Sequence, residues 1–178
     1  FLFEFSFSCA KMTEESPPNR KTNTILEISG VGENDQSSHI EEGGDLEVFG
    51  LEDHESKSFS KAILSQFSSF FSTFDGNQWN PFQTETRSQD EVNGLWNCLL
   101  LCYGGSASVT IQDSVSTLKW VKKLSIDRHV SDEDLVAQIT DFILNSAREN
   151  FINGATALRD IARDKALLYF CFDHEKEK

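Results

Sequence analysis

The stretch over residues 59–74 constrains the fold more than any other part of the sequence. Its large apolar side chains recur at steps of three and four, which places them on one side of an α-helix. The stripe consists of Phe59, Ile63, Phe67, Phe70 and Phe74, with Leu64 and Phe71 beside it. The opposite side is mostly serine and carries Lys61 as its one charge. We therefore predict an amphipathic helix over residues 57–74 whose apolar face must be covered.

Two interpretations of this face differ in what covers it. In the first, the face packs on the rest of the domain as a core helix, because five exposed phenylalanines would promote aggregation. In the second, it is an interaction surface. Its large apolar residues and serine-rich, weakly charged opposite face resemble the amphipathic lipid-packing sensors of trafficking proteins, which implies binding to curved membranes. The sequence favours the core. The candidates for partner or lipid binding are Phe59, Ile63, Phe67, Phe70, Phe71 and Phe74.

The residues before this helix are strongly acidic. Over residues 12–60, twelve acidic side chains stand against three basic ones, and the whole chain of 178 residues has a net charge of −13. Such a chain repels phosphate backbones, so we do not expect nucleic acid as a partner. Low hydropathy with Pro and Gly pairs predicts a disordered acidic tail over residues 12–56. Two apolar islands, at 25–28 and 46–51, are each a short strand or a linear motif that folds on a partner.

The first residues and the cysteines bear on the compartment. We interpret residues 1–11 as a leader or added sequence, because Met12 is the only methionine. A trimmed secretory segment is the alternative. The four cysteines lack the spacing of a disulfide framework, which favours a cytoplasmic protein. No stretch reaches the roughly eighteen apolar residues that a membrane span needs.

Residues 75–87 predict a loop, and this loop contains a short motif. Asn80, Pro81 and Phe82 form the triplet that EH-domain proteins of endocytosis bind, and this resemblance implies a linear motif for such a partner. The alternative is a turn in which Trp79 and Phe82 fold back onto the domain. Both interpretations need a loop at this position.

From Ser88 onward the sequence is helical in pattern. Ser88 and Glu91 form a capping box, and an apolar stripe after them predicts a helix over 89–103. Further helices are predicted over 114–124, from about 132 to 150, and from 155 onward. With the helix at 57–74 they predict a mainly α fold, a small bundle of four to five helices. The helical domain spans 88–172, with a solvated tail at 173–178.

Two details of this helical domain can be predicted from the same patterns. The apolar run at 166–172 continues the last helix or forms a short strand, because periodicity does not separate the two. The stripes place a common set of side chains in the core. These are Leu95, Trp96, Leu99, Leu118, Ile139, Phe142 and Leu158.

Catalytic and metal-binding patterns are weak throughout. Cys98 and Cys102 share a helix face, but a zinc site needs four ligands and the histidines have no partner spacing. The glycines at 104–108 follow a helix rather than a strand, unlike a nucleophile elbow. Asp160 and Asp164 are interpreted as part of a solvated face. The sequence therefore indicates no catalytic, cofactor-binding or metal-binding residue.

These observations favour a non-enzymatic, cytoplasmic adaptor or regulatory protein that binds protein partners. A peripheral role at membranes in trafficking is a further option. One alternative is a transcription-type regulator, because the acidic residues interleaved with apolar ones at 46–51 resemble an acidic activation segment. The second alternative is an enzyme, or part of one, whose catalytic residues the sequence does not reveal.

Overall fold

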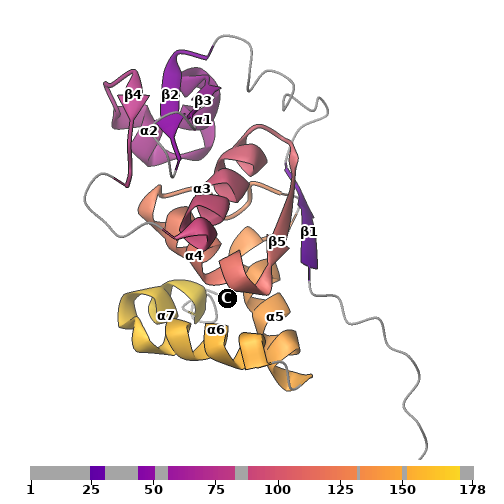
Figure 1. Ribbon diagram of the computed structural model, residues 1–178. Helices are drawn as coiled ribbons and strands as arrows, with labels where there is room; N and C mark the ends of the chain where they lie inside the picture. Colours follow the sequence, from indigo (N-terminus) through magenta and orange to yellow (C-terminus); the bar gives the residue numbers. More distant parts are fainter. Residues whose placement is uncertain are drawn as a thin grey trace, which may run out of the picture.

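The protein is mainly helical. The computed structural model describes residues 25–30, 44–50, 56–82, 88–131, 133–149 and 152–172. Within these ranges it has seven helices and five strands (Figure 1). The mainly α class predicted from the sequence is confirmed. The helix count exceeds the predicted four to five because two of the expected helices are each divided in two.

The helices and strands follow one another along the chain without a repeat. The helices are α1 (Lys61–Phe67), α2 (Ser69–Thr73), α3 (Gln89–Cys102), α4 (Ile111–Lys123), α5 (Leu135–Arg148), α6 (Ile152–Arg163) and α7 (Lys165–Phe172). The strands are β1 (Ile25–Ser29), β2 (Leu46–Phe49), β3 (Ser56–Phe59), β4 (Gln78–Trp79) and β5 (Ser106–Thr110).

The strands form two small sheets. β1 pairs antiparallel with β5, and β2 lies between antiparallel β3 and parallel β4. β1 and β2 lie inside the range 12–56 that was expected to be a disordered tail, and the structure differs from that expectation there. They coincide with the two apolar islands, so the strand interpretation applies to both. The expectations for residues 1–24, 31–43, 51–55 and 173–178 lie outside the described residues.

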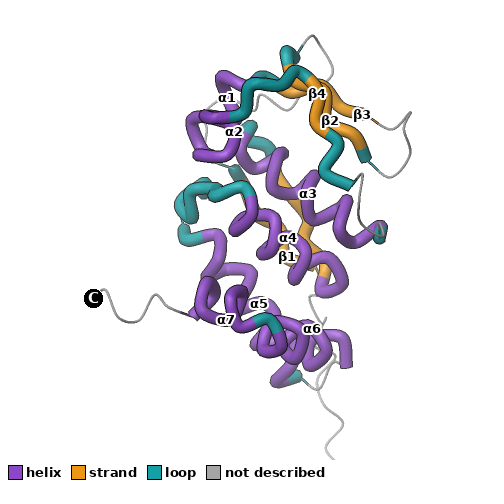
Figure 2. The backbone as a smooth tube through the Cα atoms, turned by 90° about the vertical axis from the view of Figure 1, so that its left-hand side faces the viewer, coloured by secondary structure: helices purple, strands orange, loops and turns teal. Residues whose placement is uncertain are grey.

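The elements are arranged in three layers (Figure 1). α1, α2 and the three-stranded sheet form one outer layer, α3 and α4 lie in the middle, and α5, α6 and α7 form the other outer layer. The view turned by 90° shows the same order (Figure 2). α4 contacts α3, α5, α6, α7 and β5, so it joins the middle layer to the outer layer of α5, α6 and α7.

The predicted helix over 57–74 is divided, which corrects the sequence-based prediction. Residues 56–59 form β3, and the helical part breaks at Ser68, whose backbone is extended (φ −139°, ψ 117°). Ser68 forms a bridge with Ile126, and its hydroxyl donates to the Leu124 carbonyl at 2.5 Å. Serine is favoured at such a position because its side chain can cap the next helix. Here the Ser68 hydroxyl accepts a hydrogen bond from the Phe71 amide.

The last predicted helix is also divided, and residues 166–172 are helical rather than extended. α6 ends at Arg163, and Asp164 begins α7 by accepting a hydrogen bond from the Leu167 amide at 3.0 Å. The short strand considered for 166–172 is therefore absent, since α7 covers these residues. An aspartate at this position acts as an N-cap and starts a new helix axis.

Capping sets the start of α3 and α4. The predicted box at Ser88 and Glu91 is present, with both hydrogen bonds formed. α4 begins three residues before the predicted 114, because Thr110 and Asp113 form a second capping box. The residues before it form β5, which begins at Ser106.

The core surrounds α3 and α4. Four of the predicted core residues, Leu95, Leu99, Leu118 and Ile139, are fully buried. The remaining three pack against the core but are only partly buried; they are Trp96, Phe142 and Leu158.

The two middle helices approach closely at one glycine. A Cβ atom on Gly94 would lie 2.7 Å from backbone atoms of Ser116 and Thr117 in α4. The Cys98 thiol donates to the Thr117 carbonyl at 3.4 Å in the same contact. Glycine is needed at position 94 because the two backbones leave no room for a side chain.

Replacing Gly94 with alanine should therefore destabilise the protein. In an open helix the same change is stabilising, by up to about 1 kcal/mol. Here the added methyl group overpacks the α3–α4 contact, which typically costs about 1–3 kcal/mol. Urea unfolding of Gly94→Ala measures the effect, with Gln112→Ala on the exposed side of α4 as control. An unfolding free energy equal to or above that of the wild type would contradict the close packing.

Candidate partner-binding groove

The candidate apolar face of residues 57–74 packs on the domain. Its members are Phe59 at the end of β3, Ile63 and Phe67 on α1, Phe70 and Phe71 on α2, and Phe74 after it. Phe59 and Phe71 are 1% and 2% exposed, and the other four are partly buried against the core. This burial favours the core interpretation over a free surface for lipid or a partner.

An aromatic cluster connects this layer to α4. The Trp79 ring lies 5.2 Å from Phe70 and 5.4 Å from Phe71, between ring centroids, and 6.0 Å from Trp120. The edge-to-face arrangements are those that aromatic quadrupoles prefer. Lys123 places its ammonium group 4.5 Å from the Trp120 ring centroid. The phenylalanines of α2 therefore have aromatic partners inside the protein.

The Asn-Pro-Phe triplet forms a tight turn on the domain. The Asn80 side chain accepts a hydrogen bond from the Phe82 amide at 3.1 Å. Phe82 is 3% exposed, and its ring lies 5.6 Å from that of Trp120. An EH domain would have to pull this ring out of its packing, so the geometry favours the turn interpretation for Asn80, Pro81 and Phe82.

The three cysteines among the described residues lie in the core. Cys98, Cys102 and Cys171 are free and buried. Burial raises the pKa of the Cys102 thiol to about 12 and also raises that of Cys98, so both stay protonated at neutral pH. No group of three or more His, Cys, Asp or Glu side chains in the described part of the chain could hold a metal ion.

One concave surface of the described residues lies along the exposed strip of α4. Its first hollow, of about 380 Å³, lies between the start of α3, α4 and α6. A second hollow, of about 210 Å³, continues toward Trp120 and Phe82. A third, shallow one runs between α4 and the start of α7. Lys119 lines all three, so we call the combined surface the α4 groove.

The charges in the α4 groove are unevenly distributed. The first hollow has three carboxylates, Asp90, Glu91 and Asp160, against the ammonium group of Lys119. The second is lined by Lys119 and Lys123 with Glu91, and by the largely buried Phe82 and Trp120. The groove therefore has an acidic end and an aromatic, weakly basic end.

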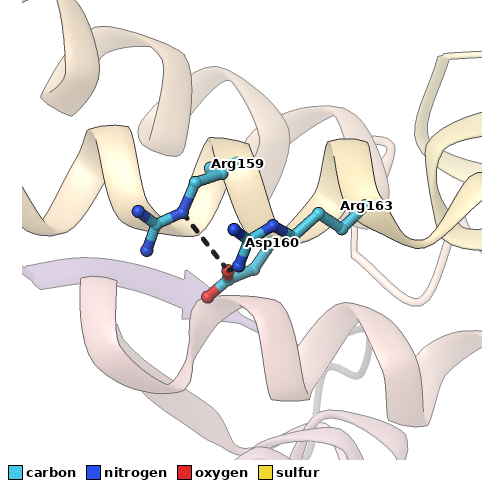
Figure 3. A network of polar contacts seen from close by, with 3 residues as sticks. All are labelled: Arg159, Asp160 and Arg163. Atoms are coloured by element: carbon cyan, nitrogen blue, oxygen red, sulfur yellow. Dashed lines mark ion pairs between the residues drawn. The ribbon is translucent and has the colours of Figure 1, made fainter.

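Local hydrogen bonds hold the groove walls in place. Glu91 closes the capping box of α3, and its carbonyl accepts from the Trp120 indole at 2.9 Å, which fixes α3 on α4. On α6, the Asp160 carboxylate lies 3.8 Å from Arg159 and 3.9 Å from Arg163 (Figure 3). These ion pairs are exposed and contribute little to stability, and the Asp160 side chain is itself 46% exposed.

The Asp113 carboxyl of α4 has a raised pKa. Burial raises the pKa of the Asp113 carboxyl, and the nearby Asp90 charge adds to that effect, while hydrogen bonds with Thr110 lower it. Asp113 caps α4 and does not line the groove. Its raised pKa is explained by this buried capping role, without a catalytic one.

Apart from Phe82, which was a candidate as part of a linear motif, the groove residues were not identified as a site from the sequence. They lie on α3, α4, α6, the start of α7 and the turn at Phe82, and only packing brings them together. Asp160 was interpreted as part of a solvated face, and the Ser88–Glu91 box as a helix start. Both interpretations describe the local structure correctly. Neither could predict that these residues line one surface, because that depends on how the helices pack.

Of the helices in the described ranges, none combines the length and the apolar character that crossing a bilayer requires.

Placing a charge on the aromatic face should unfold the protein rather than abolish membrane binding. Phe71→Asp buries an unpaired carboxylate among rings, which costs several kcal/mol. The control is Thr73→Asp, which is exposed on the same short helix. Thermal unfolding and co-sedimentation with small neutral liposomes separate the two roles. A Phe71→Asp variant that keeps the wild-type melting temperature but loses liposome binding would contradict the core interpretation.

Comparison with known proteins gives no relative: no family model, no curated protein and no solved structure matches this chain. Its function is therefore inferred from the geometry described above.

Proposed function

We propose that this protein is a non-enzymatic adaptor or regulatory module that binds a segment of a partner protein in the α4 groove. The observation that supports this most directly is the meeting of three hollows at Lys119 along one helix. A run of adjoining hollows fits an elongated ligand better than a small compact one. The buried packing of the phenylalanines at 59–74 leaves the groove as the better candidate surface.

The lining of the groove indicates the chemistry of the bound segment. The carboxylates of Asp90, Glu91 and Asp160 favour a lysine or arginine side chain in the first hollow. The rings of Phe82 and Trp120 favour an aliphatic or aromatic side chain in the second. A bound segment therefore carries a basic residue and a large apolar residue a short distance apart.

The same observations weigh against the alternatives. Leu46 and Val48 are fully buried in β2, which leaves fewer apolar side chains at 46–51 for an acidic activation segment. An enzyme would need reactive groups that converge on one point. Among the described residues that line the groove, no side chain is an activated nucleophile. The cytoplasmic location remains part of the proposal, supported by the free buried thiols.

The test uses peptides selected for binding to the full chain from a random 12-residue display library. Thr156, on α6, lines the groove, whereas its neighbour Ala155 is exposed outside it. Thr156→Trp should fill the first hollow and lower the affinity of the selected peptides by more than about tenfold, because the indole ring occupies the space that the peptide needs. Ala155→Trp adds the same ring on the same helix and should leave the affinity unchanged. Fluorescence anisotropy measures both affinities.

The proposal predicts a further property of the selected peptides. They should share a basic residue and a large apolar residue, and circular dichroism should show that both tryptophan variants are folded. Peptides that bind the Thr156→Trp variant as tightly as the wild type would place the binding surface elsewhere and overturn the groove assignment.

A further inference from the structure

β1 is an edge strand whose outer side has no partner among the described residues. In Figure 1 it lies at the margin of the molecule, with β5 on its inner side. The register pairs Ile25 with Thr110 and Ser29 with Ser106. The sheet has no third strand within the described ranges. Among the described residues, the outer edge of β1 is therefore a row of main-chain donors and acceptors that pair with no other strand.

The register fixes which backbone groups point outward. Gly30 donates its amide to the Gly105 carbonyl at 2.8 Å, so this pair is of the hydrogen-bonded type. Hydrogen-bonded and non-hydrogen-bonded pairs alternate along an antiparallel ladder. Ile28 and Leu26 therefore bond to β5. The amides and carbonyls of Ile25, Glu27 and Ser29 point away from it.

The two faces of the edge differ in character. Ile28 is 2% exposed and Leu26 packs partly against the core, so this face continues the hydrophobic interior. Ile25, Glu27 and Ser29 are exposed on the other face. Both carboxylate oxygens of Glu27 lie 2.8 Å from the Ser108 hydroxyl, which donates to them and holds the charge beside the edge.

We infer that the outer edge of β1 binds an extended segment of a partner protein, which adds a third, antiparallel strand to the β1–β5 sheet. Strand addition takes its affinity from main-chain hydrogen bonds and its specificity from alternate side chains. A lysine or arginine opposite Glu27 fits the charge, because opposite charges on facing residues stabilise a sheet. Apolar residues on either side of it would extend the face of Leu26 and Ile28.

A second copy of this chain fits the edge less well. In an antiparallel β1–β1 pair centred on residue 27, two Glu27 side chains would face each other, and like charges opposite one another are destabilising. The net charge of −13 on each copy adds long-range repulsion. This surface is separate from the α4 groove, since no residue of β1 lines it.

The test uses the full chain and a capped peptide, TVKVT, which reads the same in both directions and places lysine opposite Glu27. At saturating peptide, amide hydrogen exchange measured by NMR should slow by about tenfold or more at residues 25, 27 and 29. Leu26 and Ile28, already bonded to β5, should change far less. The control peptide carries a methyl group on the lysine backbone nitrogen, which removes a donor and blocks strand pairing.

Two variants separate the backbone and charge contributions. Ser29→Pro removes one outward amide and should lower the affinity for TVKVT about threefold to tenfold, the effect of losing one main-chain hydrogen bond. Ser29→Ala keeps that amide and should leave the affinity unchanged. Glu27→Lys should reverse the preference from TVKVT to the charge-swapped TVEVT. Hydrogen exchange at Leu26 and Ile28 reports whether each variant keeps the β1–β5 pairing.

Several outcomes would overturn the inference. One is exchange at residues 25, 27 and 29 that no concentration of TVKVT slows. Another is equal binding of the N-methylated peptide, which would place the contact away from the edge. A Glu27→Lys variant that still prefers TVKVT would remove the assigned role of Glu27. Protection of the same three amides by raised protein concentration alone would assign the edge to a second copy of the chain.

Discussion

The close crossing of α3 and α4 at Gly94 is the contact on which the rest of the structure depends. Because Gly94 meets the backbone of Ser116 and Thr117 directly, α4 is held in the centre of the molecule, where four other helices can reach it. A similar contact joins the outer helices, since a Cβ on Gly154 would lie 2.6 Å from the Ala147 backbone in α5. The α4 groove exists because α3 and α6 cover α4 from two sides and leave a strip between them.

The N-terminal layer is attached to this centre by directional polar contacts as well as by aromatic packing. The break at Ser68 pairs the chain with the loop after α4, where Asp127 donates its amide to the Phe67 carbonyl at 2.7 Å. Ser125 in that loop adopts a positive φ of 48°, and its carbonyl accepts from the Ser69 amide. On the other side, the Ser60 amide donates to the Tyr103 hydroxyl. A continuous helix over 57–74 could not make these contacts. The packing of this segment on the rest of the protein therefore explains why the helix is divided at Ser68.

Local patterns in the sequence predicted the elements they encode directly. The capping box at Ser88 and the apolar stripe of α3 both depend on neighbours within a few residues. Non-local effects were not predictable in this way. β5 pairs with a strand about eighty residues earlier, and Phe59 follows the helical period of the next segment while lying in β3. The groove is the extreme case, since its lining residues come from separate elements and none of them marks a shared surface in the sequence.

Both proposed surfaces favour basic side chains, and the overall charge of the chain bears on how they could act. A net charge of −13 attracts cationic segments and speeds their encounter with the protein. That attraction is screened beyond about 8 Å at physiological ionic strength, so it cannot select one basic segment over another. Selection has to come from short-range geometry. In the groove this is the spacing between the carboxylates and the Phe82–Trp120 hollow, and at β1 it is the alternation of outward amides around Glu27. An acidic chain with two such surfaces can therefore associate rapidly with many basic segments and retain those that fit one of these geometries.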